Sequence, residues 1–533
     1  MKTSMSRSPA AGVTITGHND SVTETDVSDA TVMTAGKNDR MSLAHVSDIA
    51  VDIRGDGDTI TANGGDAGRV KLNFPFLIDG SRDHISLLVA VQPGTPVVPT
   101  LNLGGNISVG GNNDSVLVSF EAGSVNAPIL IGGLNDNVRI IGNNDSVTGN
   151  IKLLAGSTAG TSATASLNRD AVVTGDGDQL NVHLQFVFNV VYTSHFNVTG
   201  NNDRPTENVT LNFGEVAITY TDQTGIAGDH NGVVNTVSLL AGNGMMTSSN
   251  SFAIALDTNI SGDGNNLINN LNVVTGSGAT TFGASQLAAV IGIAGSHDSV
   301  NLSTNDNLST GDGIQSETNL TLQGSDNALT GSETFDATGG GITSFIGGSV
   351  VGNGNSLDLS GNLSTGGGIQ SQTNLTLQGS DNTLSLSVNG NLTVPDSIQL
   401  ANNLALEGNN NNVDVDLSLA SNPLNPTAGG VTIANNAALQ GNNNNLDLSL
   451  ATDLLNPTAG GVTIASNAAL DGSNNSVNVI LSTDNLNPSG TSGQFVANLT
   501  VEGNNTVVNV APGSVSFTGN KTASRVSPPT AIK

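Results

Sequence analysis

The segment Asn374–Ser387 reads NLTLQGSDNTLSLS and carries the pattern that decides the fold. Leu375 and Leu377 alternate with polar residues before the central Gly-Ser-Asp-Asn, and Leu384 and Leu386 do so after it. Alternation with a period of two predicts two β-strands, because successive side chains of a strand point to opposite faces. The residues between them predict a tight turn, since Gly, Asn and Asp enter left-handed backbone conformations at low cost.

The turn recurs along the chain as a Gly followed, two and three residues later, by polar residues that are mostly Asn or Asp. The glycines of this turn motif are Gly17, Gly36, Gly55, Gly80, Gly111, Gly133, Gly142, Gly175, Gly200, Gly262, Gly295, Gly324, Gly352, Gly379, Gly408, Gly441 and Gly472. Most successive motifs lie 19 to 34 residues apart, a spacing typical of one supersecondary unit in a stacked repeat protein. Near the C-terminus, Asn425, Asn456 and Asn487, each followed by Pro, recur at a constant shift of 31 residues.

Strand–turn–strand units of this length, poor in aromatic residues, resemble the coils of a parallel β-helix. We therefore expect an all-β fold, a single-chain parallel β-helix (β-solenoid) of roughly 18 coils with very little helix, in which strands stack about 4.8 Å apart. The resemblance and the irregular coil lengths favour a right-handed helix. Stacked Asn residues at 409–412, 442–445 and 474–475 either hydrogen-bond along the axis or serve only to form turns.

The regularity of the repeat and the distribution of charge divide the chain into four segments. Residues 1–11 form a basic N-terminal tail and residues 516–533 a basic C-terminal tail. Residues 12–300 form irregular solenoid coils, and residues 301–515 form regular coils.

Composition restricts the partners of the chain. The 533 residues include no Cys and no Trp, and 15 basic residues against 44 acidic ones give a formal net charge of −29. A nucleic-acid partner is not expected, because phosphate binding needs basic side chains. No apolar stretch is long enough for a transmembrane helix, and residues 1–14 lack the apolar core of a secretory signal. We expect a cytoplasmic protein; the alternative is an extracellular or cell-surface location reached by signal-less export.

Some turns resemble fragments of the calcium-binding RTX nonapeptide, such as GDGDTI at 55–60 and GNNDSV at 111–116. If any turn held calcium, Asp56, Asp58 and Asp114 would be the ligands. RTX blocks repeat every nine residues, however, and later turns of this chain replace Asp with Asn. Calcium prefers several anionic oxygens, so the sequence favours purely structural turns and no metal or other cofactor.

Catalytic constellations are not evident in the sequence. The seven His residues lie in the first 300 residues without metal-ligand spacing, and no Lys or Arg occurs between Pro205 and Asn520. Asp414 and Asp416 alternate like a carboxylate pair, but an outward, solvated strand face is the simpler interpretation. We therefore expect no catalytic residue and no enzyme, a polysaccharide-acting β-helix enzyme being the least favoured class.

One stretch concentrates aromatic residues, among them Phe186, Phe188 and Tyr192. Either the core is wider here, or the stretch forms a lateral contact patch between solenoids.

Coil-like sequence reaches almost to both ends without an evident capping helix, so the terminal coils would expose unpaired backbone groups. In this plan the chain is similar to the bactofilins, bacterial β-helix proteins that polymerise end to end without nucleotide. We expect homopolymer filaments or a scaffold, with Val508 and Val510 in the axial contact and Lys521, Arg525 and Lys533 in lateral contacts with acidic trunks. The alternative is a secreted or cell-surface adhesin or matrix protein.

Overall fold

The computed structural model describes a chain of strands and turns. The described residues are 2–4, 12–64, 71–91, 100–125, 130–155, 165–186, 190–213, 218–241, 252–275, 285–308, 313–337, 341–365, 367–392, 398–420, 431–452, 462–483, 493–502, 507–511, 514–517 and 523–526. No helix occurs among them, which confirms the all-β prediction.

The chain divides into two compact units, each described by itself. The first unit is Met1–Gly244 together with Asn265–Ile268, and the second is Met245–Gly264 together with Asn269–Lys533. The strands of the first unit are β1 (Lys2–Ser4), β2 (Val13–His18), β3 (Ser21–Thr25), β4 (Ser28–Lys37), β5 (Arg40–Asp56), β6 (Thr59–Gly64), β7 (Lys71–Ser81), β8 (His84–Val91), β9 (Thr100–Asn112), β10 (Ser115–Val125), β11 (Leu130–Asn143), β12 (Ser146–Ala155), β13 (Ala165–Asp176), β14 (Gln179–Phe186), β15 (Val190–Asn201), β16 (Arg204–Phe213), β17 (Ile218–Ala227) and β18 (Gly232–Ala241).

The strands of the second unit, with the first residues of β20 belonging to the first unit, are β19 (Phe252–Ser261), β20 (Asn266–Thr275), β21 (Ser285–Ala294), β22 (Ser299–Leu308), β23 (Ile314–Gln323), β24 (Ala328–Ala337), β25 (Ile342–Val351), β26 (Ser356–Thr365), β27 (Ile369–Gln378), β28 (Thr383–Leu392), β29 (Ile398–Glu407), β30 (Asn412–Ala420), β31 (Val431–Gln440), β32 (Asn445–Thr452), β33 (Val462–Asp471), β34 (Ser476–Thr483), β35 (Gly493–Glu502), β36 (Val507–Ala511), β37 (Ser514–Phe517) and β38 (Ala523–Val526).

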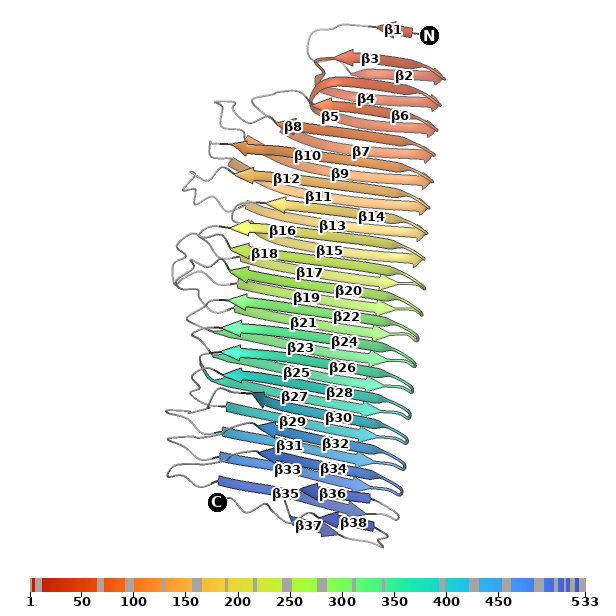
Figure 1. Cartoon of the computed structure of the whole chain (residues 1–533). Helices are drawn as coiled ribbons and strands as arrows, with labels where there is room; N and C mark the ends of the chain where they lie inside the picture. Colours follow the sequence, from red (N-terminus) through yellow and green to blue (C-terminus); the bar gives the residue numbers. More distant parts are fainter. Residues whose placement is uncertain are drawn as a thin grey trace. The chain divides into compact units, whose positions relative to one another are not determined.

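Within each unit, most strands pair in parallel with the second strand along the chain, as β27 does with β25 and with β29. The long strand β5 takes part in both sheets and therefore also pairs with its chain neighbours β4 and β6. Each coil therefore adds one strand to each of two parallel sheets, here called sheet A and sheet B, and short turns join the two strands (Figure 1). In the second unit β19, β21 and the later odd-numbered strands build sheet B, and the even-numbered strands build sheet A. With two strands in each coil, the structure gives about ten coils in this unit, whereas the sequence-based figure of roughly 18 coils refers to the whole chain.

The alternating leucines point inward and stack in register from coil to coil. In sheet B, Leu377 pairs with Val350 on one side and with Leu406 on the other. In sheet A, Leu384 pairs with Leu357 and Val413. All six side chains are buried. Burying each such side chain contributes roughly 1.5–3 kcal/mol, so ladders of this kind hold the two sheets together.

The turn motif stacks as closely as the strands do. The motif glycine of one coil lies so near the carbonyl oxygen of the motif glycine one coil earlier that an added Cβ would overlap it, as at Gly142 over Gly111 and at Gly408 over Gly379. The third residue of the motif is left-handed, with φ of 58° at both Asn144 and Asn410. Glycine is thus required by the close approach of successive turns, and Asn by the backbone conformation.

This steric requirement can be tested at one turn. Gly142→Ala places a methyl group against the Gly111 carbonyl, and we expect it to lower the free energy of unfolding by at least about 3 kcal/mol. Gly149→Ala is the matched control, because an added Cβ meets nothing within 4 Å there. Urea unfolding followed by circular dichroism measures both. Equal stabilities of the two variants would contradict the close stacking of the turns.

Candidate functional site

The fourth residue of the turn motif points inward and forms a column along the solenoid, here called the inner ladder. Its members are Asp39, Asp58, Asp83, Asp114, Asp145, Asp178, Asp203, Asn231 and Asn265 in the first unit, and Asp298, Asn327, Asn355, Asn382, Asn411, Asn444 and Asn475 in the second. All of them are buried. Within each unit the backbone N–H of a member donates to Oδ1 of the member one coil later, as from Asp114 to Asp145 (2.9 Å) and from Asn382 to Asn411 (3.0 Å).

The Asp and Asn members of the inner ladder differ in their second side-chain atom, which is Oδ2 in Asp and Nδ2 in Asn. The Nδ2 group of Asn327 donates to the carbonyl oxygen of Gly295 (2.9 Å), and that of Asn355 donates to Gly324 (3.0 Å). At the aspartates the second oxygen takes the place of Nδ2. Burial raises the pKa of several of these carboxyl groups, to about 7 for Asp114 and to about 6 for Asp203. Desolvation is the largest cause, because a charged carboxylate loses its water inside the turn.

The residues predicted as calcium candidates lie on different sides of the turn. Asp58 and Asp114 belong to the inner ladder, where Asp58 accepts hydrogen bonds from the Asp39 N–H (2.9 Å) and the Thr34 hydroxyl (3.0 Å). Asp56 instead lies in the turn surface and pairs with Lys37 at 2.9 Å. The pKa of Asp56 is lowered, chiefly by its hydrogen bond to Lys37. The structure therefore does not bring these three carboxylates together.

Asn residues of the turn surface form the hydrogen bonds that the sequence suggested, and they also shape the turn. The Asn442 N–H donates to Asn409 Oδ1 (2.8 Å), and Asn445 Nδ2 donates to Asn412 Oδ1 (2.8 Å). Asn443 takes the left-handed conformation with φ of 58°. The axial hydrogen bonds are thus present, so these Asn residues do not serve only to form turns.

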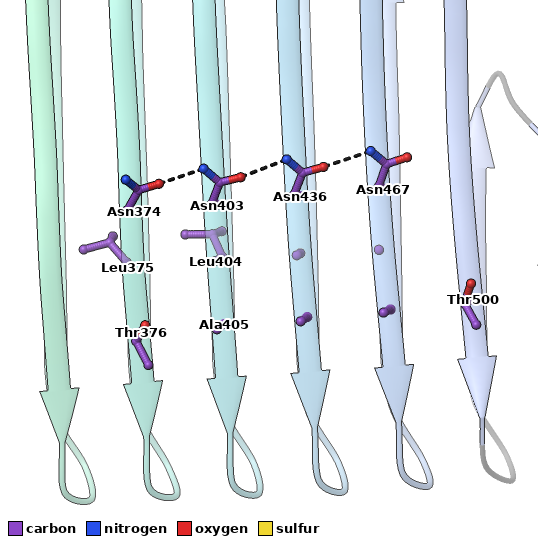
Figure 2. A pocket seen from close by; sticks show the side chains of 13 residues that line it. Asn374, Leu375, Thr376, Asn403, Leu404, Ala405, Asn436, Asn467 and Thr500 are labelled. Atoms are coloured by element: carbon purple, nitrogen blue, oxygen red, sulfur yellow. Dashed lines mark hydrogen bonds between the residues drawn. The ribbon is translucent and has the colours of Figure 1, made fainter.

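A second Asn column runs over the outer face of sheet B in the second unit (Figure 2). Asn403 donates to Asn374 (2.7 Å), Asn436 donates to Asn403 (2.8 Å), and Asn467 donates to Asn436 (2.8 Å). These side chains line an open groove of about 430 Å³. The floor beside them consists of small side chains, namely Thr376, Ala405, Ala438, Ala469 and Thr500. The Asn column and the small side chains beside it, here called the Asn strip, present amide hydrogen-bonding groups and a flat surface to an extended molecule.

Polar side chains also occur inside the first unit, where the two sheets face each other. Glu207 is buried and accepts hydrogen bonds from the hydroxyl groups of Tyr192 and of Ser194, the latter at 3.2 Å. On the next coil, Asn235 Nδ2 donates to Asp222 Oδ2 at 3.1 Å. These hydrogen bonds lie in the interior of the first unit.

Glu333 faces the interior of the second unit, beside a small cavity of about 40 Å³. It accepts a hydrogen bond from the Thr318 hydroxyl at 3.1 Å. Burial raises the pKa of its carboxyl group above the usual value. Asn269 lines the same cavity and is buried. A cavity of this size can hold about one water molecule, so it provides no room for a larger ligand.

The aromatic stretch builds the core. Tyr192 is fully buried and stacks on Tyr220, with ring centroids 5.3 Å apart. Its side chain is therefore not part of a lateral contact surface, and the wider-core interpretation holds at this position. Phe186 ends β14, and Phe188 lies outside the described residues.

The predicted assembly residues lie near the end of the second unit. Val508 and Val510 are in β36, which pairs with both β34 and β38, so they are not in the outermost strand of sheet A. Arg525 lies in that outermost strand, β38. Lys521 and Lys533 lie outside the described residues.

Other candidate chemistry is dispersed. Within the part of the chain that the structure describes, no three His, Asp or Glu side chains gather as a metal site would require. Asp414 and Asp416 are exposed, as the outward-face interpretation predicts. The described segments also include no helix long and apolar enough to cross a membrane.

Comparison of the chain with family models, with curated proteins and with solved structures finds no match. The fold itself defines the class: the protein is a parallel β-solenoid repeat protein.

Glu207 and Asn402 were not singled out by the sequence analysis, although the position of each residue in its strand predicts that it is buried. Glu207 shares its strand face with Val209 and Leu211, and Asn402 shares its face with Leu400 and Leu404. A polar residue in phase with the inward apolar residues is expected to be buried. The Asn strip of Figure 2 has the opposite phase, and its columns follow from the register of the coils.

The buried pair Asn402–Asn435 provides a test of the interior. Asn402 Nδ2 donates to Asn435 Oδ1 (2.9 Å), and both residues are buried. Asn402→Leu leaves that oxygen without its donor, so we expect a loss of about 1–3 kcal/mol in the free energy of unfolding. The double variant Asn402→Leu/Asn435→Leu should recover most of it, because neither polar partner remains. Chemical denaturation measures both variants, and a double variant less stable than the single one would contradict the pairing.

Proposed function

We propose that the protein is a structural, non-catalytic β-solenoid that assembles with copies of itself into filaments or a scaffold, without nucleotide or other cofactor. The observation that carries this proposal is that successive coils contact each other in the same way along each unit. Each coil docks on the next through parallel strands in register and through the inner ladder. A further coil supplied by another copy could use the same donors and acceptors.

The ends of the ladders support axial growth. Among the described residues, β1 pairs with β3 alone, β37 with β35 alone and β38 with β36 alone. These strands lie in or next to the segments that the sequence analysis assigned to basic tails. A strand paired on one side presents free N–H and C=O groups, the pattern that recruits another strand. Because such a contact is head to tail, it generates an open filament.

Charge supports a weaker, lateral contact. Residues 205–520 contain no Lys or Arg, whereas Lys521, Arg525 and Lys533 follow them. Basic ends can lie on the acidic face of a neighbouring copy. Exposed ion pairs are worth about 0–1 kcal/mol each, so this contact should be sensitive to salt.

The outer strip of sheet B favours a second candidate, a cell-surface or matrix protein that binds an extended polar polymer along the Asn column. Fractionation of the native host separates the candidates. The filament proposal predicts a cell-associated, cytoplasmic pool, and recovery mainly from washed culture medium would favour the second candidate.

Electron microscopy tests assembly directly. Purified protein in buffer without nucleotide should form filaments whose length grows with protein concentration. Uniform single solenoids across protein and salt concentrations would contradict the proposal.

A pair of proline variants tests the axial contact. Successive N–H groups of a parallel strand point to opposite neighbours, so of Ser524→Pro and Arg525→Pro one removes a donor to β36 and the other a donor on the free side of β38. We expect filaments to be lost in the variant that leaves the melting temperature unchanged. Arg525→Gln is the matched control for charge and should affect only salt-sensitive bundling. Normal filaments from both proline variants would contradict an end-to-end sheet contact.

A further inference from the structure

The inner ladder of the first unit contains carboxyl groups that are only half satisfied. In each of them Oδ1 accepts the N–H of the preceding rung, while Oδ2 is buried without a hydrogen-bond partner. The inner aspartates are here Asp83, Asp114, Asp145, Asp178 and Asp203, and Oδ2 of Asp39 is buried without a partner in the same way. Asp58 differs, because its Oδ2 accepts the hydroxyl of Thr34. A buried carboxylate oxygen without a donor is costly, so the inner aspartates need another explanation.

The Asn rungs show what Oδ2 faces. In Asn327, Asn355 and Asn411 the Nδ2 group donates to the carbonyl oxygen of the motif glycine one coil earlier, at 2.9–3.0 Å. The same place beside the motif glycine is occupied by Nδ2 of Asn327 at Gly324 and by Oδ2 of Asp178 at Gly175. At an inner aspartate Oδ2 therefore faces the carbonyl oxygen, and in the ionised form neither of these two oxygen atoms has a proton to donate.

We propose that each inner aspartate is a proton-binding site, in which a proton on Oδ2 is donated to the carbonyl oxygen of the motif glycine one coil earlier. The ligand is a proton from solvent, and the product is a neutral carboxylic acid. A protonated Asp then has the donor and acceptor pattern of Asn, with Oδ1 accepting and the second atom donating. The Asp ladder of the first unit and the Asn ladder of the second unit become equivalent in hydrogen bonding.

The surroundings favour the neutral form. Asp178 is flanked by the inner aspartates Asp145 and Asp203 and by Asp176 at the turn surface, and all three oppose its ionisation. Asp83 faces Asp58 and Asp56 in the same way. Arg82 and Lys37 lie in neighbouring turns, but Arg82 acts on Asp114 through its backbone N–H, and Lys37 pairs with Asp56.

The pKa values agree with this geometry. Burial, followed by repulsion from these neighbours, raises the pKa to about 6 for Asp83 and to about 7 for Asp178, while backbone N–H donors lower it in part. For Asp145 burial also raises the pKa. Because the unfolded pKa is about 3.9, the folded protein binds more protons, and stability decreases as pH rises. The contribution is fully present below about pH 4, is lost between about pH 4 and pH 7, and stays constant above that range.

Infrared spectroscopy detects the protons directly. At pH 5.5 or so, where exposed carboxyl groups are ionised, the full-length protein should show the C=O stretch of buried carboxylic acid, and unfolding should abolish it. Replacing the inner aspartates by Asn together should also remove most of the band. A folded protein whose spectrum shows carboxylate alone at this pH would overturn the proposal.

A single substitution measures the consequence for stability. At pH 8, Asp178→Asn should raise the melting temperature by roughly 2–4 °C, because Nδ2 supplies the missing donor to the carbonyl oxygen of Gly142. At pH 5 the variant and the wild type should melt together, since the pKa of Asp178 is raised to about 7 and the wild type then carries the proton. The matched control is Asp79→Asn, which removes an exposed carboxylate and should give the same small shift at both pH values.

Two outcomes of that experiment would overturn the proposal. Destabilisation by Asp178→Asn at both pH values, with the fold retained by circular dichroism, would show that this position of the inner ladder needs a carboxylate. A rise in the melting temperature of the wild type with calcium at pH 8, absent in Asp178→Asn, would assign the carboxylate to an ion. Hydrogen exchange by mass spectrometry over residues 175–178 locates the effect at this turn.

Discussion

The close stacking of one turn on the next is the constraint on which the rest of the structure depends. The motif glycine leaves room for the carbonyl oxygen of the turn one coil earlier, and the inward Asp or Asn ties the two turns together through its Oδ1. The strand register then follows, because stacked turns fix the positions of both strands of a coil relative to the strands of the coil before. The leucine ladders require this register, since a slip of one residue would turn every inward side chain outward.

The inner ladder is built with two chemistries: most of its members in the first unit are Asp, and most of its members in the second unit are Asn. Asn satisfies both neighbours with one amide, whereas Asp needs a proton to do so. Stacking many carboxylates about 4.8 Å apart inside a protein would otherwise accumulate repulsion along the column. The formal net charge of −29 counts the inner aspartates as ionised, so a neutral inner ladder makes the chain less acidic than that figure. In the proposed assembly, copies would meet through acidic faces, basic ends and terminal strands.

Much of the fold could be predicted from the sequence, because its determinants are local. Alternation around Leu375 and Leu384 specifies strands, and the turn motif specifies their connection. The inner ladder was harder to predict, since an Asp in a Gly-rich turn ordinarily faces solvent or binds a cation, and only the stacking of coils buries Asp58 and Asp114. The role of Tyr192 was open for a similar reason: its partner Tyr220 lies one coil away, and sequence alone does not fix that register.

The central claim, that the inner ladder locks each turn to the next, is tested most directly by amide hydrogen exchange at the ladder residues. The backbone N–H groups of Asn382 and Asn411 each donate to the side chain one coil on, and we expect them to exchange as slowly as those of the buried Leu384 and Val413 nearby. Measurement with residue resolution on the full chain decides the matter. Exchange at Asn382 and Asn411 as fast as in an unstructured peptide, while Leu384 and Val413 stay protected, would contradict the account.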